Sequence, residues 1–278
     1  MKKSSSILVN KNTITAIAIG GFDGMHLAHQ ELFKNLGNHG GIVVVESGYA
    51  NITPKTYRQE YTNYPIYYYV LEDIKHLTGE EFIHLLKEEF PSLEKIVVGF
   101  DFCFGKNRKN CIPELNSLFD GEVIVVKEVK NNEIAVHSRV IREYLKIGDI
   151  KTANELLNRK YKIFGKQIKG QGLGSKSFVP TINIKVTDFI LPNEGVYATR
   201  TIINEKKYNS VTFLGHRITT DGSFAVETHI LEEDIKNMYN LVQIIFIEKI
   251  RENQKFEKFE DLKVQIIKDI DQAKIILN

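Results

Sequence analysis

The chain has 278 residues, of which 42% are hydrophobic and 26% charged, with 37 Lys+Arg against 35 Asp+Glu. These fractions are typical of a globular protein and exclude a disordered or collagen-like chain. The length favours two domains, and the formal net charge of +2 is too small to indicate a nucleic-acid-binding protein. The N-terminus has no apolar stretch of the length that a signal peptide needs.

No apolar run reaches the roughly 18 residues of a membrane span, so we expect a cytoplasmic protein with neither a membrane nor a nucleic acid as its partner. The two cysteines, Cys103 and Cys111, are too few for a disulfide framework or a four-thiolate zinc site. We expect them to be reduced thiols.

The first half of the chain alternates short apolar runs with helical patterns. Runs rich in Ile and Val predict buried strands of a parallel sheet at residues 14–19, 42–45, 96–98 and 123–126. The clearest helix is predicted over residues 80–90, with Thr78 and Glu81 as its capping box. This alternation predicts a Rossmann-like α/β domain, whose ligands bind beyond the carboxyl ends of the strands.

The pattern changes after a short helix that begins at Asp149. Six runs then follow without a clear helix between them, at residues 161–169, 181–186, 196–203, 208–214, 224–231 and 241–247. Successive strands of this kind predict an antiparallel barrel or sandwich. A final helix is expected from residue 259 to 273. We therefore predict two domains, residues 1–158 and residues 159–278.

Two segments of the first half carry chemistry at the ends of predicted strands. In GGFDGMHLAHQ (residues 20–30), glycines let backbone amides approach a phosphate, and His26 and His29 lie on one helix face. Two imidazoles there can stabilise the charge on a leaving pyrophosphate. In residues 98–110, aromatic rings can stack on a ligand and cations can hold phosphate. A glycine turn with exposed histidines and a solvated basic loop are the competing interpretations.

The second half has a glycine-rich loop (residues 170–183) and one glutamate of interest. Thr181 and Asn183 are two apart on an extended chain, so they share a face, and their oxygens suit Mg²⁺. Glu227 lies on the polar side of a strand with His229, where a carboxylate can accept the proton of an attacking hydroxyl. A flexible loop and a solvated glutamate are the alternatives.

Together these segments resemble, in chain order, the bacterial bifunctional riboflavin kinase/FAD synthetase family. GGFDGMHLAHQ and VVGFDFCFGKNRK resemble its adenylyltransferase module, and GQGLGSKSFVPTIN and LPNEGVYA resemble its riboflavin kinase module. The resemblance implies an α/β nucleotidyltransferase domain followed by a six-stranded antiparallel riboflavin kinase β-barrel with a C-terminal helix. Ala28, where the family usually has Gly, and Val140, where it has Arg, depart from its pattern.

The resemblance also implies residue roles. Glu227 would be the base of the kinase, Thr181 and Asn183 would hold Mg²⁺, and His26 and His29 would act on the ATP phosphates. The further ATP-binding residues would be Gly20, Phe22, Asp23, Gly24, Ser138, Arg139, Arg142, Gly170, Gly172, Gly174 and Lys176. The flavin-binding residues would be Asp101, Phe102, Phe104, Arg251, Gln254 and Phe256.

By this resemblance the chain would phosphorylate riboflavin to FMN with ATP and then transfer AMP from a second ATP to FMN, giving FAD and pyrophosphate. Three alternatives stay open: a riboflavin kinase whose first domain has lost its activity, a nucleotidyltransferase for another phosphorylated substrate, and a flavin-binding regulatory module.

Overall fold

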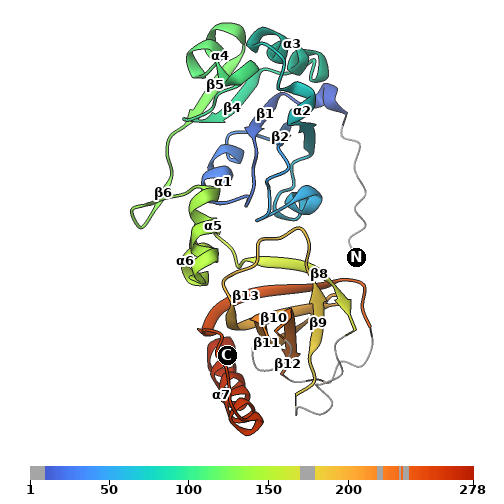
Figure 1. Cartoon of the computed structure of the whole chain (residues 1–278). Coiled ribbons are helices and arrows are strands. Elements are labelled where there is room, and N and C mark those ends of the chain that lie inside the picture. The colour runs from blue at the N-terminus through green and yellow to red at the C-terminus, as the bar shows by residue number, and fades with distance from the viewer. Residues whose placement is uncertain (1–9, 170–178, 218–221, 232, 234–237) are drawn as a thin grey trace. The chain divides into compact units, whose positions relative to one another are not determined.

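The computed structural model describes residues 10–169, 179–217, 222–231, 233 and 238–278. By its internal contacts the chain divides into two compact units, Met1–Ser138 and Arg139–Asn278 (Figure 1). The second unit therefore contains two helices that precede the predicted domain boundary at residue 158.

The first unit is built on a five-stranded parallel sheet with the order β3-β2-β1-β4-β5 (Figure 1). Its strands are β1 (Ala16–Gly20), β2 (Gly40–Glu46), β3 (Ile66–Val70), β4 (Lys95–Gly99) and β5 (Glu122–Val126). The four predicted strands and the α/β class are confirmed. Strand β3 was missed, because its IYYYV sequence is only half-buried at the sheet edge and lacks a clear alternation. The strand order reverses direction between β1 and β4, which is where ligands bind in sheets of this kind.

Helices cover both faces of this sheet. They are α1 (Leu27–Phe33), α2 (Leu71–Ile74), α3 (Gly79–Glu89) and α4 (Ile112–Leu118), with short 3₁₀ segments η1 (Lys11–Thr13), η2 (Lys55–Tyr61) and η3 (Lys106–Arg108) and a small hairpin of β6 (Lys130–Asn131) and β7 (Ile134–Ala135). Strand β1 divides its side chains between two cores: Ile17 and Ile19 pack on the side of α3, whereas Ala16 and Ala18 pack on the side of α1. The Thr78–Glu81 capping box of α3 is confirmed.

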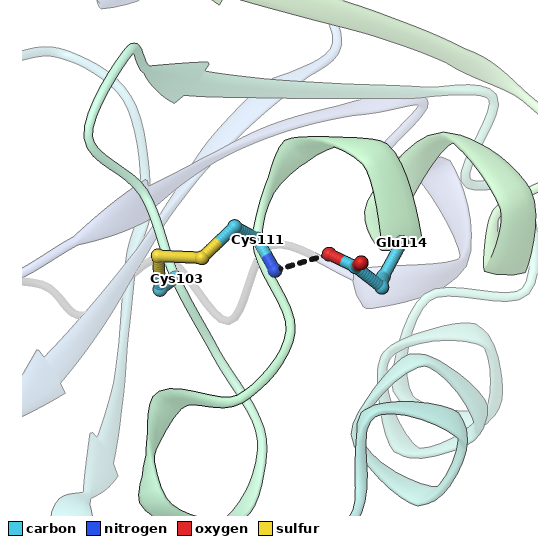
Figure 2. Close-up of a disulfide and its surroundings, with 3 residues drawn as sticks. All are labelled: Cys103, Cys111 and Glu114. Carbon is cyan, nitrogen blue, oxygen red and sulfur yellow. Dashed lines mark hydrogen bonds between the residues drawn. A yellow bond between two sulfur atoms is a disulfide. The ribbon is translucent and has the colours of Figure 1, made fainter.

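The disulfide of the first unit corrects one prediction. Cys103 and Cys111 are bonded to each other rather than present as reduced thiols (Figure 2). The physical reason is a local reversal of the chain, in which Phe104 and Asn110 pair through their backbones and bring the flanking cysteines opposite each other. The Glu114 carboxylate accepts the N–H of Cys111 at 2.7 Å and thereby caps α4. A count of cysteines cannot reveal such a reversal.

The second unit is a closed antiparallel barrel with the strand order β10-β11-β12-β9-β8-β13. Its strands are β8 (Lys162–Ile168), β9 (Ile182–Lys185), β10 (Gly195–Ile203), β11 (Lys206–His216), β12 (Phe224–Ile230) and β13 (Val242–Arg251). Its helices are α5 (Ser138–Ile147), whose first residue belongs to the first unit, α6 (Ile150–Leu157) and α7 (Phe259–Leu277). All six predicted strands and the last helix are confirmed.

Helix α7 packs on the outside of the barrel. Ala273 and Leu277 lie against Val196, Ala198 and Val211 of the barrel strands. The buried Asp269 of α7 accepts hydrogen bonds from Nε and Nη2 of Arg251, at 2.9 and 2.8 Å. The helix is therefore held to β13 by an ion pair as well as by apolar contact.

Hydroxyl groups fill part of the barrel interior. Successive hydroxyl oxygens, 2.8–3.3 Å apart, form a closed ring through Thr199, Ser210, Thr201, Thr228, Thr212 and back to Thr199. All five side chains are fully buried. Each hydroxyl has one proton to donate, so a ring in which every member donates once and accepts once satisfies the whole set.

Candidate active sites

A cavity of about 920 Å³ lies at the carboxyl ends of β1 and β4 in the first unit. This is the place at which the strand order predicts a ligand. The predicted residues that line it are Gly20, Phe22, His26, His29, Asp101, Phe102, Phe104 and Ser138. Arg139 and Arg142 belong to the second unit, and their contact with ATP stays a prediction.

The two histidines of this cavity stack on each other. Their ring centroids are 3.5 Å apart with an interplanar angle of 20°, and His26 is almost fully buried at the residue before α1. The Ser138 hydroxyl donates to the carbonyl of Asp23 at 2.6 Å. Its single proton is used there, so Nε2 of His26, 3.2 Å away, donates to the Ser138 oxygen. The proton of neutral His26 is thereby placed on Nε2.

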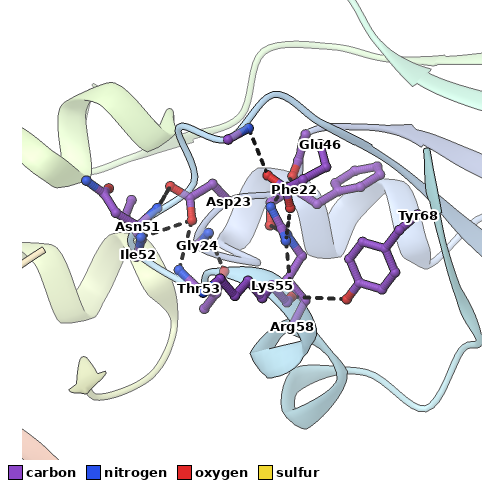
Figure 3. A network of polar contacts seen from close by, with 12 residues as sticks. Phe22, Asp23, Gly24, Glu46, Asn51, Ile52, Thr53, Lys55, Arg58 and Tyr68 are labelled. Carbon is purple, nitrogen blue, oxygen red and sulfur yellow. Dashed lines mark hydrogen bonds and ion pairs between the residues drawn. The ribbon is translucent and has the colours of Figure 1, made fainter. Parts of the chain in front are cut away.

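Asp23 is predicted to bind ATP, but in the structure its carboxylate is hydrogen-bonded to backbone groups of the protein. It accepts hydrogen bonds from the backbone N–H groups of Asn51, Ile52 and Thr53, at 3.1, 3.0 and 2.8 Å (Figure 3). The Thr53 hydroxyl oxygen in turn accepts the N–H of Gly24 at 2.6 Å. These bonds fix the glycine-rich loop against residues 51–53. Neither Asp23 nor Gly24 lines the cavity, so their contact with ATP stays a prediction.

Arg58 also holds the glycine-rich loop in place, and sequence analysis did not identify this residue. Its guanidinium is 1% exposed and donates to the carbonyls of Gly21 and Phe22 at 3.1 and 3.3 Å (Figure 3). It also forms an ion pair with Glu46 at 2.8 Å. The loop needs this support because Phe22 has a φ of 46°, a left-handed conformation that costs a bulky residue energy. Residues 57–60 are polar, and nothing in them signals a buried cation.

The aromatic residues of the second segment take different positions. Phe102 and Phe104 stack at 5.6 Å, and Phe104 is buried against Phe82 in the core. Phe100, which was not predicted as a site residue, lines the cavity with 44% of its surface exposed. Lys106 and Arg108 also line the cavity, inside the loop that the disulfide closes. Aromatic rings and the side chains of Lys106 and Arg108 therefore line the same cavity.

On the barrel, strand pairing brings together the predicted base and the predicted metal ligand. Asn183 of β9 and Glu227 of β12 are directly opposite each other in the antiparallel ladder. Arg217, which follows β11, donates to the Glu227 carboxylate at 2.6 Å and to Oδ1 of Asn183 at 2.7 Å. Thr181 is exposed just before β9. The predicted residues Gly170, Gly172, Gly174 and Lys176 lie outside the described residues.

Near this site, Glu194 links the last residue of β11 to a residue that follows β13. Its carboxylate accepts the backbone N–H of His216 at 3.0 Å, contacts Nδ1 of that ring at 2.7 Å, and accepts from the Asn253 side chain at 3.1 Å. The backbone bond from His216 is the main cause that lowers the pKa of Glu194. The segment predicted to cap a flavin is thus attached through Asn253.

The three predicted flavin-capping residues differ in their surroundings. The Arg251 guanidinium is bound to Asp269 and lies 5.9 Å from the centroid of the half-buried Phe256 ring, while Gln254 is exposed. Their contact with flavin stays a prediction.

Two family models match this chain. Residues 157–277 match the one described as riboflavin kinase, and residues 57–140 match the one described as FAD synthetase. The bifunctional riboflavin kinase/FMN adenylyltransferase of Haemophilus influenzae is 28% identical over 95% of this chain and 94% of its own. The Bacillus subtilis protein of the same name is 25% identical, over 93% and 91%. The chain belongs to the bacterial bifunctional riboflavin kinase/FMN adenylyltransferase family.

The riboflavin kinase match covers the barrel and α7, and the FAD synthetase match covers β3 to the start of α5. Most of α5 and α6 falls between the two matches, and the predicted boundary at residue 158 stays a prediction. A crystal structure described as a macrolide-efflux protein from Streptococcus pneumoniae superimposes with a TM-score of 0.84 and 25% identity, covering 94% of each chain. Within the described part of the chain, no helix has the length and apolarity needed to span a membrane.

Proposed function

We propose that the two units carry two successive ATP-dependent reactions, with the barrel phosphorylating riboflavin to FMN and the first unit converting FMN to FAD. The observation that carries this proposal is the presence of two separate polar sites, one in each compact unit. One is the stacked His26–His29 pair in its cavity, and the other is the Asn183–Glu227 pair on the barrel. Because both reactions consume ATP, we place the protein in the cytoplasm.

In the kinase reaction, the oxygen of the terminal ribityl hydroxyl attacks the γ-phosphorus of ATP, and ADP leaves. Glu227 accepts the proton of that hydroxyl. Asn183 and Thr181 would hold Mg²⁺, which supplies neutralisation of the phosphate charge. Their neutral oxygens fit that ion, because Mg²⁺ takes few protein ligands and borrows phosphate oxygens.

In the adenylyl transfer, an FMN phosphate oxygen attacks the α-phosphorus of ATP and the bond to pyrophosphate breaks. His26 and His29 would hydrogen-bond the phosphates and stabilise the charge that develops on the pyrophosphate. Phe100, Phe102 and Asp101 line the same cavity, where an isoalloxazine ring could stack beside the triphosphate. Positioning and electrostatics would then supply most of the rate.

One competing function has a specific observation behind it. Ala28 lines the cavity beside the histidines, where the resemblance leads one to expect glycine. A methyl group there narrows the phosphate path, which would leave a riboflavin kinase with an inactive first unit.

Chromatography of the flavins formed from riboflavin, ATP and Mg²⁺ tests both activities. The wild type should form FMN and then FAD. Glu227→Gln should form no FMN from riboflavin but should still convert supplied FMN to FAD. His29→Ala should still form FMN from riboflavin but should not convert FMN to FAD. Matched controls are Glu233→Gln, which removes an exposed partner of Lys206, and His84→Ala on the exposed face of α3. FMN without any FAD in the wild type would establish the competing function.

A further inference from the structure

Arg217 contacts both residues on which the proposed kinase site depends. It lies directly after β11, and its side chain reaches across to Glu227 of β12 and Asn183 of β9. The side chains of Arg217 and Glu227 are only 17% and 24% exposed. Water competes weakly for bonds that are shielded to this degree, so they restrict side-chain rotation more than a surface ion pair does.

Every nitrogen of the guanidinium is engaged. Nε and Nη2 donate to Oε1 of Glu227, at 3.0 and 2.6 Å. Nη2 also donates to Oδ1 of Asn183 at 2.7 Å, and Nη1 donates to the Ser223 hydroxyl oxygen at 2.6 Å. Since the guanidinium is planar and its donors diverge at fixed angles, four bonds of this kind define the plane of the group.

This arrangement fixes the orientation of both partners. Arginine has no acceptor, so the Asn183 amide must turn its oxygen, not its nitrogen, toward Arg217. That is the oxygen predicted to hold Mg²⁺. Both bonds to Glu227 go to Oε1, which leaves Oε2 without a bond to any other residue within the described segments. The carboxylate is therefore anchored through one oxygen and can accept through the other.

The backbone of Arg217 is hydrogen-bonded independently of its guanidinium group. The N–H of Arg217 donates to the carbonyl of Ser223 at 2.9 Å, and the N–H of Gly222 donates to the carbonyl of Arg217 at 3.1 Å. These two backbone bonds would survive the loss of the side chain. The contacts to Glu227 and Asn183 are thus additional to this backbone pairing of Arg217 with Gly222 and Ser223.

We propose that Arg217 is a positioning residue of the kinase site, which holds the carboxylate of Glu227 and the amide oxygen of Asn183 in one fixed arrangement. This inference rests on the proposed kinase function. Because a single cation binds both groups, it couples the residue proposed to take the substrate proton to the residue predicted to hold Mg²⁺.

Kinetics of FMN formation test this role in Arg217→Ala and Arg217→Lys. We expect kcat to fall by about 100-fold in Arg217→Ala, the loss that misplacement of a reacting group causes, with little change in KM for riboflavin. Arg217→Lys should also lose activity, because an ammonium group cannot make the same divergent bonds. Free guanidinium chloride at non-denaturing concentration should restore turnover to Arg217→Ala, whereas KCl of the same ionic strength should not.

Matched controls separate positioning from folding. Arg200→Ala removes another half-buried barrel arginine, whose guanidinium donates to the carbonyl of Leu277 at 3.2 Å, and it should keep full kinase activity. Conversion of supplied FMN to FAD should be unchanged in all these variants. Wild-type kcat in Arg217→Ala or Arg217→Lys would overturn the proposal, as would a loss that guanidinium fails to rescue.

A second readout does not depend on turnover. In protein labelled with ¹⁵N-arginine, the Nε–H signal absent from Arg217→Lys belongs to Arg217. We expect this signal to move in Glu227→Gln and in Asn183→Ala, and on addition of ADP with Mg²⁺. A signal indifferent to both substitutions would overturn the proposal. If wild type made no FMN, or Glu227→Gln kept full activity, the kinase function itself would fail, and the NMR signal would still decide whether Arg217 holds the two groups.

Discussion

The imidazole of His26 donates to the hydroxyl of Ser138, and this hydroxyl donates in turn to the backbone carbonyl of Asp23, over distances of 3.2 and 2.6 Å. The chain joins two segments that sequence analysis singled out separately, the glycine-rich loop after β1 and the first residue of α5. Ser138 was predicted to bind ATP. The structure gives it a further role, because it determines which nitrogen of His26 carries the proton.

Ser138→Ala should therefore impair FAD formation while sparing FMN formation. Loss of one hydrogen bond of about 1 kcal/mol corresponds to a fall of roughly three- to tenfold in rate. The measurement is the initial rate of FAD formation from supplied FMN. Ser117→Ala on α4, whose hydroxyl donates to the Glu114 carbonyl of its own helix, is the control. An undiminished rate in Ser138→Ala would mean that His26 does not need this partner.

Asp23→Ala should destabilise the first unit. The substitution leaves the buried N–H groups of Ile52 and Thr53 without their acceptor, at a cost of roughly 3 kcal/mol in the free energy of unfolding. Urea denaturation followed by the tyrosine signal measures this loss. Asp73→Ala, at an exposed position on α2, should leave the midpoint unchanged. Equal midpoints for both variants would contradict a structural role for the Asp23 carboxylate.

His229 should make the barrel sensitive to mild acid. Burial lowers the pKa of its imidazole and nearby Lys274 adds to this, whereas the hydrogen bond to the Pro180 carbonyl opposes it. The unfolded chain takes up a proton below about pH 6.5, but the folded chain does so only at lower pH. Stability is thus full above about pH 6.5 and falls as the pH drops below it.

Melting temperatures across this pH range, compared with those of His229→Gln, isolate the contribution of His229. The wild type should lose more stability on acidification than the variant does. Parallel curves would show that His229 titrates alike in the folded and unfolded chains.

Reduction of the Cys103–Cys111 disulfide should destabilise the first unit. For a loop of this length, the chain-entropy effect of a disulfide is about 2–3 kcal/mol. Dithiothreitol should lower the urea midpoint of the wild type and have no effect on a Cys103→Ser/Cys111→Ser double variant. If the reductant left the wild-type midpoint unchanged, the two sulfurs would not be bonded in solution.

Periodicity and turn chemistry were sufficient to predict most of the fold. Buried Ile and Val runs gave four sheet strands, and the Thr78–Glu81 box located α3, because these signals are local. Strand β3 is different, because it gains its place only by pairing with β2 along the sheet edge. Local sequence cannot specify a partner for a half-exposed run of tyrosines.

The site residues divide in the same way. Gly20, His26 and His29, which line the cavity, could be singled out because they are close together in sequence and lead into one helix. Arg58 and Arg217 were not, since each acts through contacts that only the folded chain creates. Their sequence surroundings are polar, like those of any surface arginine. Residues that hold a site in shape are therefore the hardest to find from sequence.

The hydroxyl ring inside the barrel has a consequence for how this domain can diverge. Replacing Thr212 by valine alone leaves Thr199 and Thr228 with one ring partner fewer. Their hydroxyls then depend on the backbone carbonyls of Ser210 and Val211, at the longer distances of 3.2 and 3.3 Å. Exchange between threonine and serine keeps the circuit intact. In an alignment of related barrels, positions 199, 201, 210, 212 and 228 should thus either retain hydroxyls together or turn apolar together, and lineages with a partial ring should be rare.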